Sequence, residues 1–259
     1  MAAAQPPTRG EKATFNYLVW QDLYREVKPY RTARTEGEQT TNLKFDLGDV
    51  QTVHDVRGGG ELLTLDKNGF VYLNLASAME PADFYQPEKI ENIFLPECQA
   101  VLRGLFSNHT VLIFNWRVRR NRENFNTDDD QPPARIQLKS TSQNVHVDQS
   151  WSSTARRVRL HFPDKAESIL SSRVQMLNIW RPINGPVQDR PLAVCDARTV
   201  NKGNMVEVDI LRDNYVGHIM YPLYDPGMTW YYMSGQDNTE LLIFKSFDTA
   251  EGVAKCTDA

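Results

Sequence analysis

The sequence predicts a mainly β protein with flanking helices. Three observations support that class: short strand-like segments recur through the second half of the chain, one apolar helical face lies in the first half, and 259 residues are enough for one large domain. Single all-β barrels commonly reach about 200–250 residues. Many short strands at loop-sized spacing are typical of a sandwich or a barrel.

Charge and hydropathy narrow the classes of function. Lys and Arg number 29 against 33 Asp and Glu, and the formal net charge is -4. Binding driven by phosphate neutralisation needs a strongly basic face, so we expect no nucleic-acid partner. The N-terminus has no apolar signal region and no 18-residue apolar run occurs, so we expect a cytoplasmic protein without a membrane partner. Three scattered cysteines without C-x-x-C spacing indicate neither a disulfide framework nor a zinc ribbon.

The first half of the chain contains a lead-in, a strand and a helix. Residues 1–12 are small, polar and Pro-containing, so we expect a disordered lead-in before a single domain at 13–259 with a helical N-terminal elaboration. Residues 69–75 alternate as a strand does. Across 88–106 apolar residues recur at three- and four-residue intervals, which predicts a helix interrupted or restarted at Pro96.

Strands dominate the rest of the prediction. The continuous apolar run at 110–114 predicts a buried strand, the acidic stretch at 127–133 predicts a loop, and 163–172 predicts a short helix that Pro163 begins. Alternating or apolar segments predict the other strands, at 144–148, 175–180, 192–195, 205–210, 217–221, 230–232 and 241–244.

The tripeptide His146-Val147-Asp148 is the sharpest short signal for chemistry. In an extended strand, residues i and i+2 point to the same face, so the imidazole and the carboxylate converge. Two ligands of a 2-His-1-carboxylate Fe(II) site have this geometry, with positions left open for a co-substrate and oxygen. A histidine paired with an aspartate on a sheet surface is the alternative, because such a tripeptide alone arises by chance in many chains.

Ordered blocks on both sides of the tripeptide resemble a known family. The blocks lie at 15–18, 145–148, 178–187, 191–198, 230–232 and 241–248. Their order across residues 14–255 resembles the fungal asaB hydroxylase/desaturase family, whose relatives include gibberellin desaturase-like and cephem methoxylase-like proteins. The resemblance implies a double-stranded β-helix (jelly-roll, cupin-like) core and a role in tailoring secondary metabolites. Most members are regarded as Fe(II)/2-oxoglutarate oxygenases.

The sequence departs from that family near the end of the match. The family pattern implies a Pro-His-Thr-Ala-Phe-like segment with the distal iron-binding His, and then an Arg that holds the 2-oxoglutarate carboxylate. The expected His falls at about Ala259, and no Arg follows Arg212. His218 is a candidate substitute ligand, and Lys245 offers a point charge without the fork of an Arg. We therefore expect a scaffold that has lost its iron and co-substrate site and uses no cofactor.

The favoured hypothesis is a cofactor-independent cyclase. It would catalyse a non-oxidative cyclisation or a pericyclic step of the hetero-Diels–Alder type on a polyketide or terpenoid. Proximity supplies about 7–11 kcal/mol in favourable cases, and a donor aimed at a developing oxyanion adds a few more. The expected catalytic residues are His146, Asp148, Arg181, Asp196, Arg198, Trp230 and Tyr232.

Two alternatives stay open. The first is an Fe(II)/2-oxoglutarate-dependent hydroxylase or desaturase of the same substrate class, with iron held by His146, Asp148 and either His218 or a residue from a partner. The second is a non-catalytic subunit that pairs with an intact oxygenase. The expected small-molecule partner is a hydrophobic natural product, and the exposed sheet edges of a jelly roll favour a homodimer.

Overall fold

Strands hold more residues than helices in the computed structural model, which describes residues 10–32, 40–57, 59, 62–119, 141–212 and 215–257. The α-helices are α1 (Pro87–Lys89), α2 (Leu95–Leu105), α3 (Trp151–His161) and α4 (Ala166–Leu170). The predicted class, mainly β with flanking helices, is confirmed. The strands are β1 (Gly10–Ala13), β2 (Asn16–Leu18), β3 (Tyr30–Thr32), β4 (Phe45–Leu47), β5 (Gln51–Asp55), β6 (Phe70–Asn74), β7 (Gln175–Trp180), β8 (Val194–Cys195), β9 (Met205–Arg212), β10 (Tyr215–Pro222), β11 (Trp230–Tyr232) and β12 (Glu240–Asp248).

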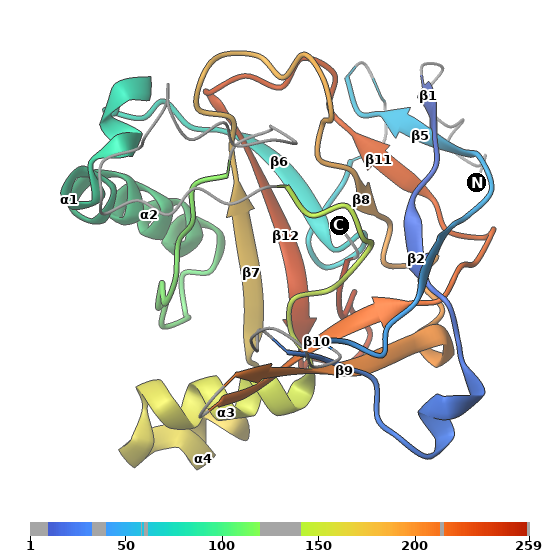
Figure 1. Cartoon of the computed structure of the whole chain (residues 1–259). Coiled ribbons are helices and arrows are strands. Elements are labelled where there is room, and N and C mark those ends of the chain that lie inside the picture. The colour runs from blue at the N-terminus through green and yellow to red at the C-terminus, as the bar shows by residue number, and fades with distance from the viewer. Residues whose placement is uncertain are drawn as a thin grey trace.

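Two sheets enclose the main core (Figure 1). One has the order β6-β12-β7 and is antiparallel throughout, and the other has the order β1-β5-β11-β8. A buried cluster draws side chains from both sheets, since Phe70 and Leu242 come from β6 and β12 while Val194 and Tyr231 come from β8 and β11. Burying each such side chain stabilises the fold by about 1.5–3 kcal/mol. This shared core holds the two sheets face to face.

Helix α2 covers the other face of the β6-β12-β7 sheet (Figure 1). Ile243 of β12 points to this side and packs with Leu102 of α2, as period-2 alternation requires. A π-helical turn, Ile90–Phe94, joins α1 to α2 directly before Pro96. Because Pro96 has no N–H to donate, the first turn of a helix tolerates it and an interior position would not. The predicted interrupted helix at 88–106 is confirmed.

A third sheet with the order β10-β9-β3 lies beneath the other two in the view of Figure 1. Strands β9 and β10 form an antiparallel pair, and β3 runs parallel to β9. Val208 of β9 and Tyr221 of β10 are buried against Leu18 of β2 and Tyr24. The small β2-β4 sheet is thereby joined to the third sheet through a hydrophobic cluster.

Two local predictions fail in the structure. Residues 110–114 form no strand, and Leu112 and Phe114 are 45% and 37% exposed. The guanidinium of Arg157 lies over the Phe114 ring, 4.3 Å from its centre, so a long side chain covers this ring in place of a sheet. Residues 144–148 are extended but form only isolated bridges, at Asn144 and Val147.

Helix α3 has no signal in the sequence pattern. Its buried residues are Ser153, Thr154, Ala155 and Val158, which are small or polar and leave no apolar periodicity. A capping box starts the helix, since Ser150 and Ser153 each accept the other's backbone N–H through a hydroxyl. Local capping therefore defines the start of a helix that hydropathy alone does not predict.

Strand β1 takes in residues 10–12, which the sequence assigned to the lead-in, and pairs with β5. Residues 1–9, the predicted loop at 127–133 and the position of the expected distal His at Ala259 lie outside the described residues. Within the described ranges, no helix has both the length and the apolar character needed to cross a bilayer.

Candidate functional site

His146 and Asp148 lie on one side of an extended segment that its valines anchor. Val145 and Val147 are almost fully buried. Val147 also exchanges two backbone hydrogen bonds with Met220 of β10, at 2.8 and 2.9 Å. Because successive side chains of an extended chain point to opposite faces, the buried valines turn His146 and Asp148 together to the other face.

The imidazole of His146 is held by a backbone carbonyl. Nδ1 lies 2.9 Å from the carbonyl oxygen of Asn144. A carbonyl oxygen only accepts, so Nδ1–H donates and the lone pair of a neutral ring sits on Nε2. Nε2 faces Asp148 Oδ1 at 3.6 Å. The other carboxylate oxygen, Oδ2, accepts a hydrogen bond of 2.9 Å from the side-chain amide of Asn178.

The electrostatics of this pair favour a cation between the two side chains. Burial disfavours protonation of His146, but the carboxylate of Asp148 outweighs that effect and the pKa of His146 is raised. Burial likewise opposes ionisation of Asp148, yet hydrogen bonds with His146 and Asn178 and the charge of Arg119 lower its pKa to about 2. Neutral Nε2 and ionised Oδ1 are both acceptors, so a proton or a metal ion between them would satisfy both atoms.

The donor set fits two positions of a facial iron site. Each of His146 and Asp148 keeps one ligand atom directed toward the other, while its remaining polar atom is hydrogen-bonded. Such outer partners orient metal ligands and fix the imidazole tautomer. In the part of the chain that the structure describes, no third His, Cys, Asp or Glu joins this pair in a cluster of ligand distance.

His218, the candidate third ligand, belongs to a different cluster. Its Nδ1 lies 2.9 Å from Asp209 Oδ1, across the β9-β10 pair, and 3.7 Å from Glu207. The ammonium of Lys28 lies between the same carboxylates, at 2.9 Å from Glu207 and 2.5 Å from Asp209. Lys28 therefore supplies the cation that these acids need, and the structure does not bring His218 to His146.

This separation predicts a silent variant. His218→Ala should leave the affinity for Fe(II) within about twofold of the wild type, because His218 does not belong to the proposed ligand pair. Loss of a true metal ligand would exceed the roughly 10–100-fold cost of losing an outer partner. Anaerobic Fe(II) titration of the folded variant measures the difference. A loss of a hundredfold or more would show that His218 reaches the metal after all.

The predicted residue Arg181 directly follows β7 and lies between two aromatic rings. Its guanidinium carbon is 5.3 Å from the ring centres of both Phe84 and Phe94. Burial lowers the pKa of Arg181. Its Nε and Nη1 are buried and make no hydrogen bond to the described residues. Its contacts place it at the cluster around Met79, Ile90 and Val118 and not beside His146.

The predicted residues Asp196 and Arg198 bind one another. The buried carboxylate of Asp196 accepts from Arg198 Nε at 3.0 Å and Nη2 at 2.5 Å, and also from the amide of Asn68 at 3.0 Å. These charge-assisted hydrogen bonds hold the loop after β8 in place.

The predicted residues Trp230 and Tyr232 lie in the hydrophobic core. Trp230 is fully buried and stacks on Phe15, with ring centres 4.4 Å apart. Both belong to the cluster that also contains Tyr17 and Val145. Trp230 and Tyr232 therefore pack against the buried face of the segment that carries His146, because Val145 directly precedes that histidine.

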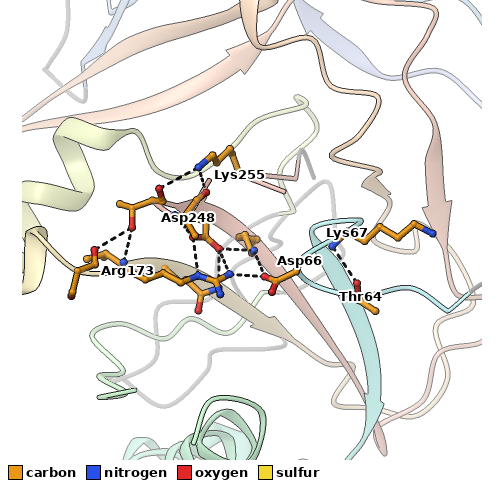
Figure 2. A network of polar contacts seen from close by, with 12 residues as sticks. Thr64, Asp66, Lys67, Arg173, Asp248 and Lys255 are labelled. Carbon is orange, nitrogen blue, oxygen red and sulfur yellow. Dashed lines mark hydrogen bonds and ion pairs between the residues drawn. The ribbon is translucent and has the colours of Figure 1, made fainter. Parts of the chain in front are cut away.

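Lys245, the expected point charge for a co-substrate, is bound within a polar network at the end of β12. Figure 2 shows this network around Asp248, Asp66 and Arg173. The ammonium of Lys245 is completely buried and donates to Asp248 at 2.7 Å and to Asp66 at 3.1 Å. Arg173 donates to the same two carboxylates, at 2.7 and 2.6 Å. Lys245 therefore balances two acids of the fold.

Three residues around the pair were not predicted from the sequence: Asn144, Asn178 and Arg119. Asn144 and Asn178 were each inside a segment assigned as a strand, where an asparagine has no signal of its own. Nothing in the sequence joins residue 178 to residue 148, because that contact depends on how β7 packs beside the extended segment. Arg119 belongs to no motif in the sequence, and its charge acts on both His146 and Asp148.

Comparison with known proteins identifies the family of this chain. Residues 15–258 match the family model described as "YDMC: Oxidoreductase/YMDC permease-like domain". The chain belongs to this family. Its relatives include hydroxylase/desaturase poxK of Penicillium oxalicum, 26% identical over 94% of this chain and 80% of that protein. Aspirochlorine biosynthesis protein N of Aspergillus oryzae is 35% identical over 47% of this chain, and the match spans half of its own length.

The solved structures confirm the fold. The iron and alpha-ketoglutarate-dependent endoperoxidase NvfI superimposes with a TM-score of 0.80 over 96% of this chain and 88% of its own, at 20% identity. The jelly-roll expectation and the resemblance to the fungal hydroxylase/desaturase family are both confirmed.

The expectation of a chain without a cofactor is wrong. The Fe(II)/2-oxoglutarate-dependent dioxygenase nvfI of Aspergillus novofumigatus is 26% identical over 87% of this chain and 79% of that protein. Relatives along most of the chain are thus named for the iron and co-substrate that the favoured hypothesis had excluded. Two residues expected near Ala259 therefore say less about the cofactor than the similarity along the rest of the chain.

Proposed function

We propose that this chain is an Fe(II)/2-oxoglutarate-dependent oxygenase that hydroxylates or desaturates a hydrophobic natural product of fungal secondary metabolism. The observation that carries the proposal is the pair of ligand atoms, His146 Nε2 and Asp148 Oδ1, which face one another at 3.6 Å. The names of the relatives poxK and nvfI support the same reaction class. The cyclase hypothesis has no comparable support among these relatives.

Each residue of the pair has a defined role in this proposal. His146 and Asp148 would hold ferrous iron, which with 2-oxoglutarate supplies the activation of dioxygen that oxidises a substrate C–H bond. The Asn144 carbonyl keeps the proton on Nδ1 and so leaves Nε2 free to bind. The low pKa of Asp148 keeps its carboxylate ionised at neutral pH. The positive charge of Arg119 favours that ionised state and gives the site an attraction for carboxylates.

Aromatic side chains near the pair support the proposed substrate class. The ring of Tyr221 lies 6.3 Å from the ring of His146. Strand β7 carries Trp180 on the same face as Asn178, and Trp180 packs with the buried cluster of Leu242 and Phe244. Aromatic and aliphatic side chains with few polar groups among them suit a hydrophobic small molecule.

The test is an anaerobic titration of metal-free protein with Fe(II) and 2-oxoglutarate. We expect stoichiometric heat in calorimetry and a visible charge-transfer band from the chelated complex. Admission of oxygen should then convert 2-oxoglutarate into succinate and carbon dioxide, slowly without substrate and faster with a hydrophobic natural product. Absence of both the band and the heat, with the protein folded, would overturn the proposal.

A further inference from the structure

We infer that Asn178 is a positioning residue that fixes which oxygen of Asp148 faces the metal. This inference rests on the proposed function, because it concerns the same ligand pair. The side-chain amide of Asn178 donates to Asp148 Oδ2 at 2.9 Å and also lies 3.2 Å from the hydroxyl of Ser246. One amide nitrogen thus links the metal-binding carboxylate to strand β12.

The strands place this amide by their register. Asn178 pairs with Phe244, Leu177 pairs with Lys245, and the register then shifts so that Met176 pairs with Phe247. Ser246 is the extra residue of this irregularity. A bulge re-aims a side chain, and here it directs the Ser246 hydroxyl at the amide of Asn178. An amide NH₂ has two donors, so it can serve both oxygens at once.

The need for such a partner follows from the exposure of Asp148. Its side chain is 44% exposed, so packing alone does not fix the rotation of its carboxylate. The bond from Asn178 occupies Oδ2 and leaves Oδ1 on the side of His146. Without that bond, either oxygen or a water molecule can take the position that faces the metal. Outer hydrogen bonds of this kind typically contribute about 10–100-fold in metal affinity.

The experiment compares Fe(II) and Co(II) affinities of the full chain by anaerobic titration. Asn178→Leu removes both donors while keeping the same branched arrangement of side-chain heavy atoms, and it suits the apolar face shared with Trp180. Asn178→Ala is the second variant, used if leucine does not fold. We expect either one to bind both metals about 10–100-fold more weakly than the wild type. We also expect an altered visible Co(II) spectrum, because the carboxylate then binds in a different orientation.

Gln175→Ala is the matched control. Gln175 lies on the same strand and its amide also donates to a carboxylate, Asp248 Oδ2 at 3.0 Å. Its loss should change neither the metal affinities beyond about twofold nor the Co(II) spectrum. Asn178 variants that fold and match the wild type in both readouts would overturn the inference while leaving the iron site intact. A wild-type protein that binds neither metal would overturn the proposed function and the inference with it.

Discussion

His146→Ala or Asp148→Ala is expected to weaken Fe(II) binding by more than a hundredfold and to abolish consumption of 2-oxoglutarate. Each variant removes one of the two ligand atoms that face each other at 3.6 Å. The effect should exceed the roughly 10–100-fold expected when only an outer hydrogen bond is lost. Anaerobic Fe(II) titration and the yield of succinate under oxygen measure the two losses separately.

The folded state must be checked in both variants, because the side chains of His146 and Asp148 also contact one another. His161→Ala is the control: this histidine is exposed at the end of α3, away from the pair. It should bind iron and consume 2-oxoglutarate as the wild type does. If either ligand variant kept full consumption of 2-oxoglutarate while folded, the iron would have to bind elsewhere.

The strand pattern was predictable where the side-chain periodicity reports burial directly. Leu241, Leu242 and Ile243 are fully buried in β12, a central strand covered on both faces, and such strands appear in a sequence as continuous apolar runs. The run at 110–114 is also apolar but pairs with no strand among the described residues, because chain-distant pairing partners decide whether an apolar run becomes a strand.

The ligand pair was predictable for a local reason, and its surroundings were not. His146 and Asp148 are two residues apart, so strand geometry alone brings their side chains to one face. The partners of that pair come from 30 residues later in the chain, at Asn178, and from a register shift in β12. His218 shows the converse. Its distance along the sequence suited a third ligand, but the pairing of β9 with β10 places its imidazole against the carboxylate of Asp209.

Asp248→Asn is expected to destabilise the fold by about 3–5 kcal/mol at neutral pH, the usual cost of removing one partner of a buried ion pair. The carboxylate of Asp248 is completely buried and accepts hydrogen bonds from Lys245, Arg173, Gln175 and the backbone N–H of Ala250. Loss of its charge leaves the buried ammonium of Lys245 with Asp66 alone, at 3.1 Å. Urea unfolding measures the change in free energy.

The stability that Asp248 contributes depends on pH, and the direction follows from the pKa of its carboxyl group. Burial opposes ionisation of Asp248, but the hydrogen bonds from Arg173 and Lys245 prevail and lower its pKa from 3.8 to about 2. A lowered carboxyl pKa contributes stability that is present above the unfolded value and is lost as pH falls. The wild type should therefore lose this contribution between about pH 4 and pH 2, and Asp248→Asn should lack that part of the acid dependence.

Asp66→Asn separates the buried carboxylate from its exposed neighbour. Asp66 contacts the same Lys245 and Arg173, but its side chain is 54% exposed. An exposed ion pair contributes about 0–1 kcal/mol, so this variant should cost far less than Asp248→Asn. Equal losses for the two variants, or an Asp248→Asn variant within 1 kcal/mol of the wild type, would contradict the role of burial.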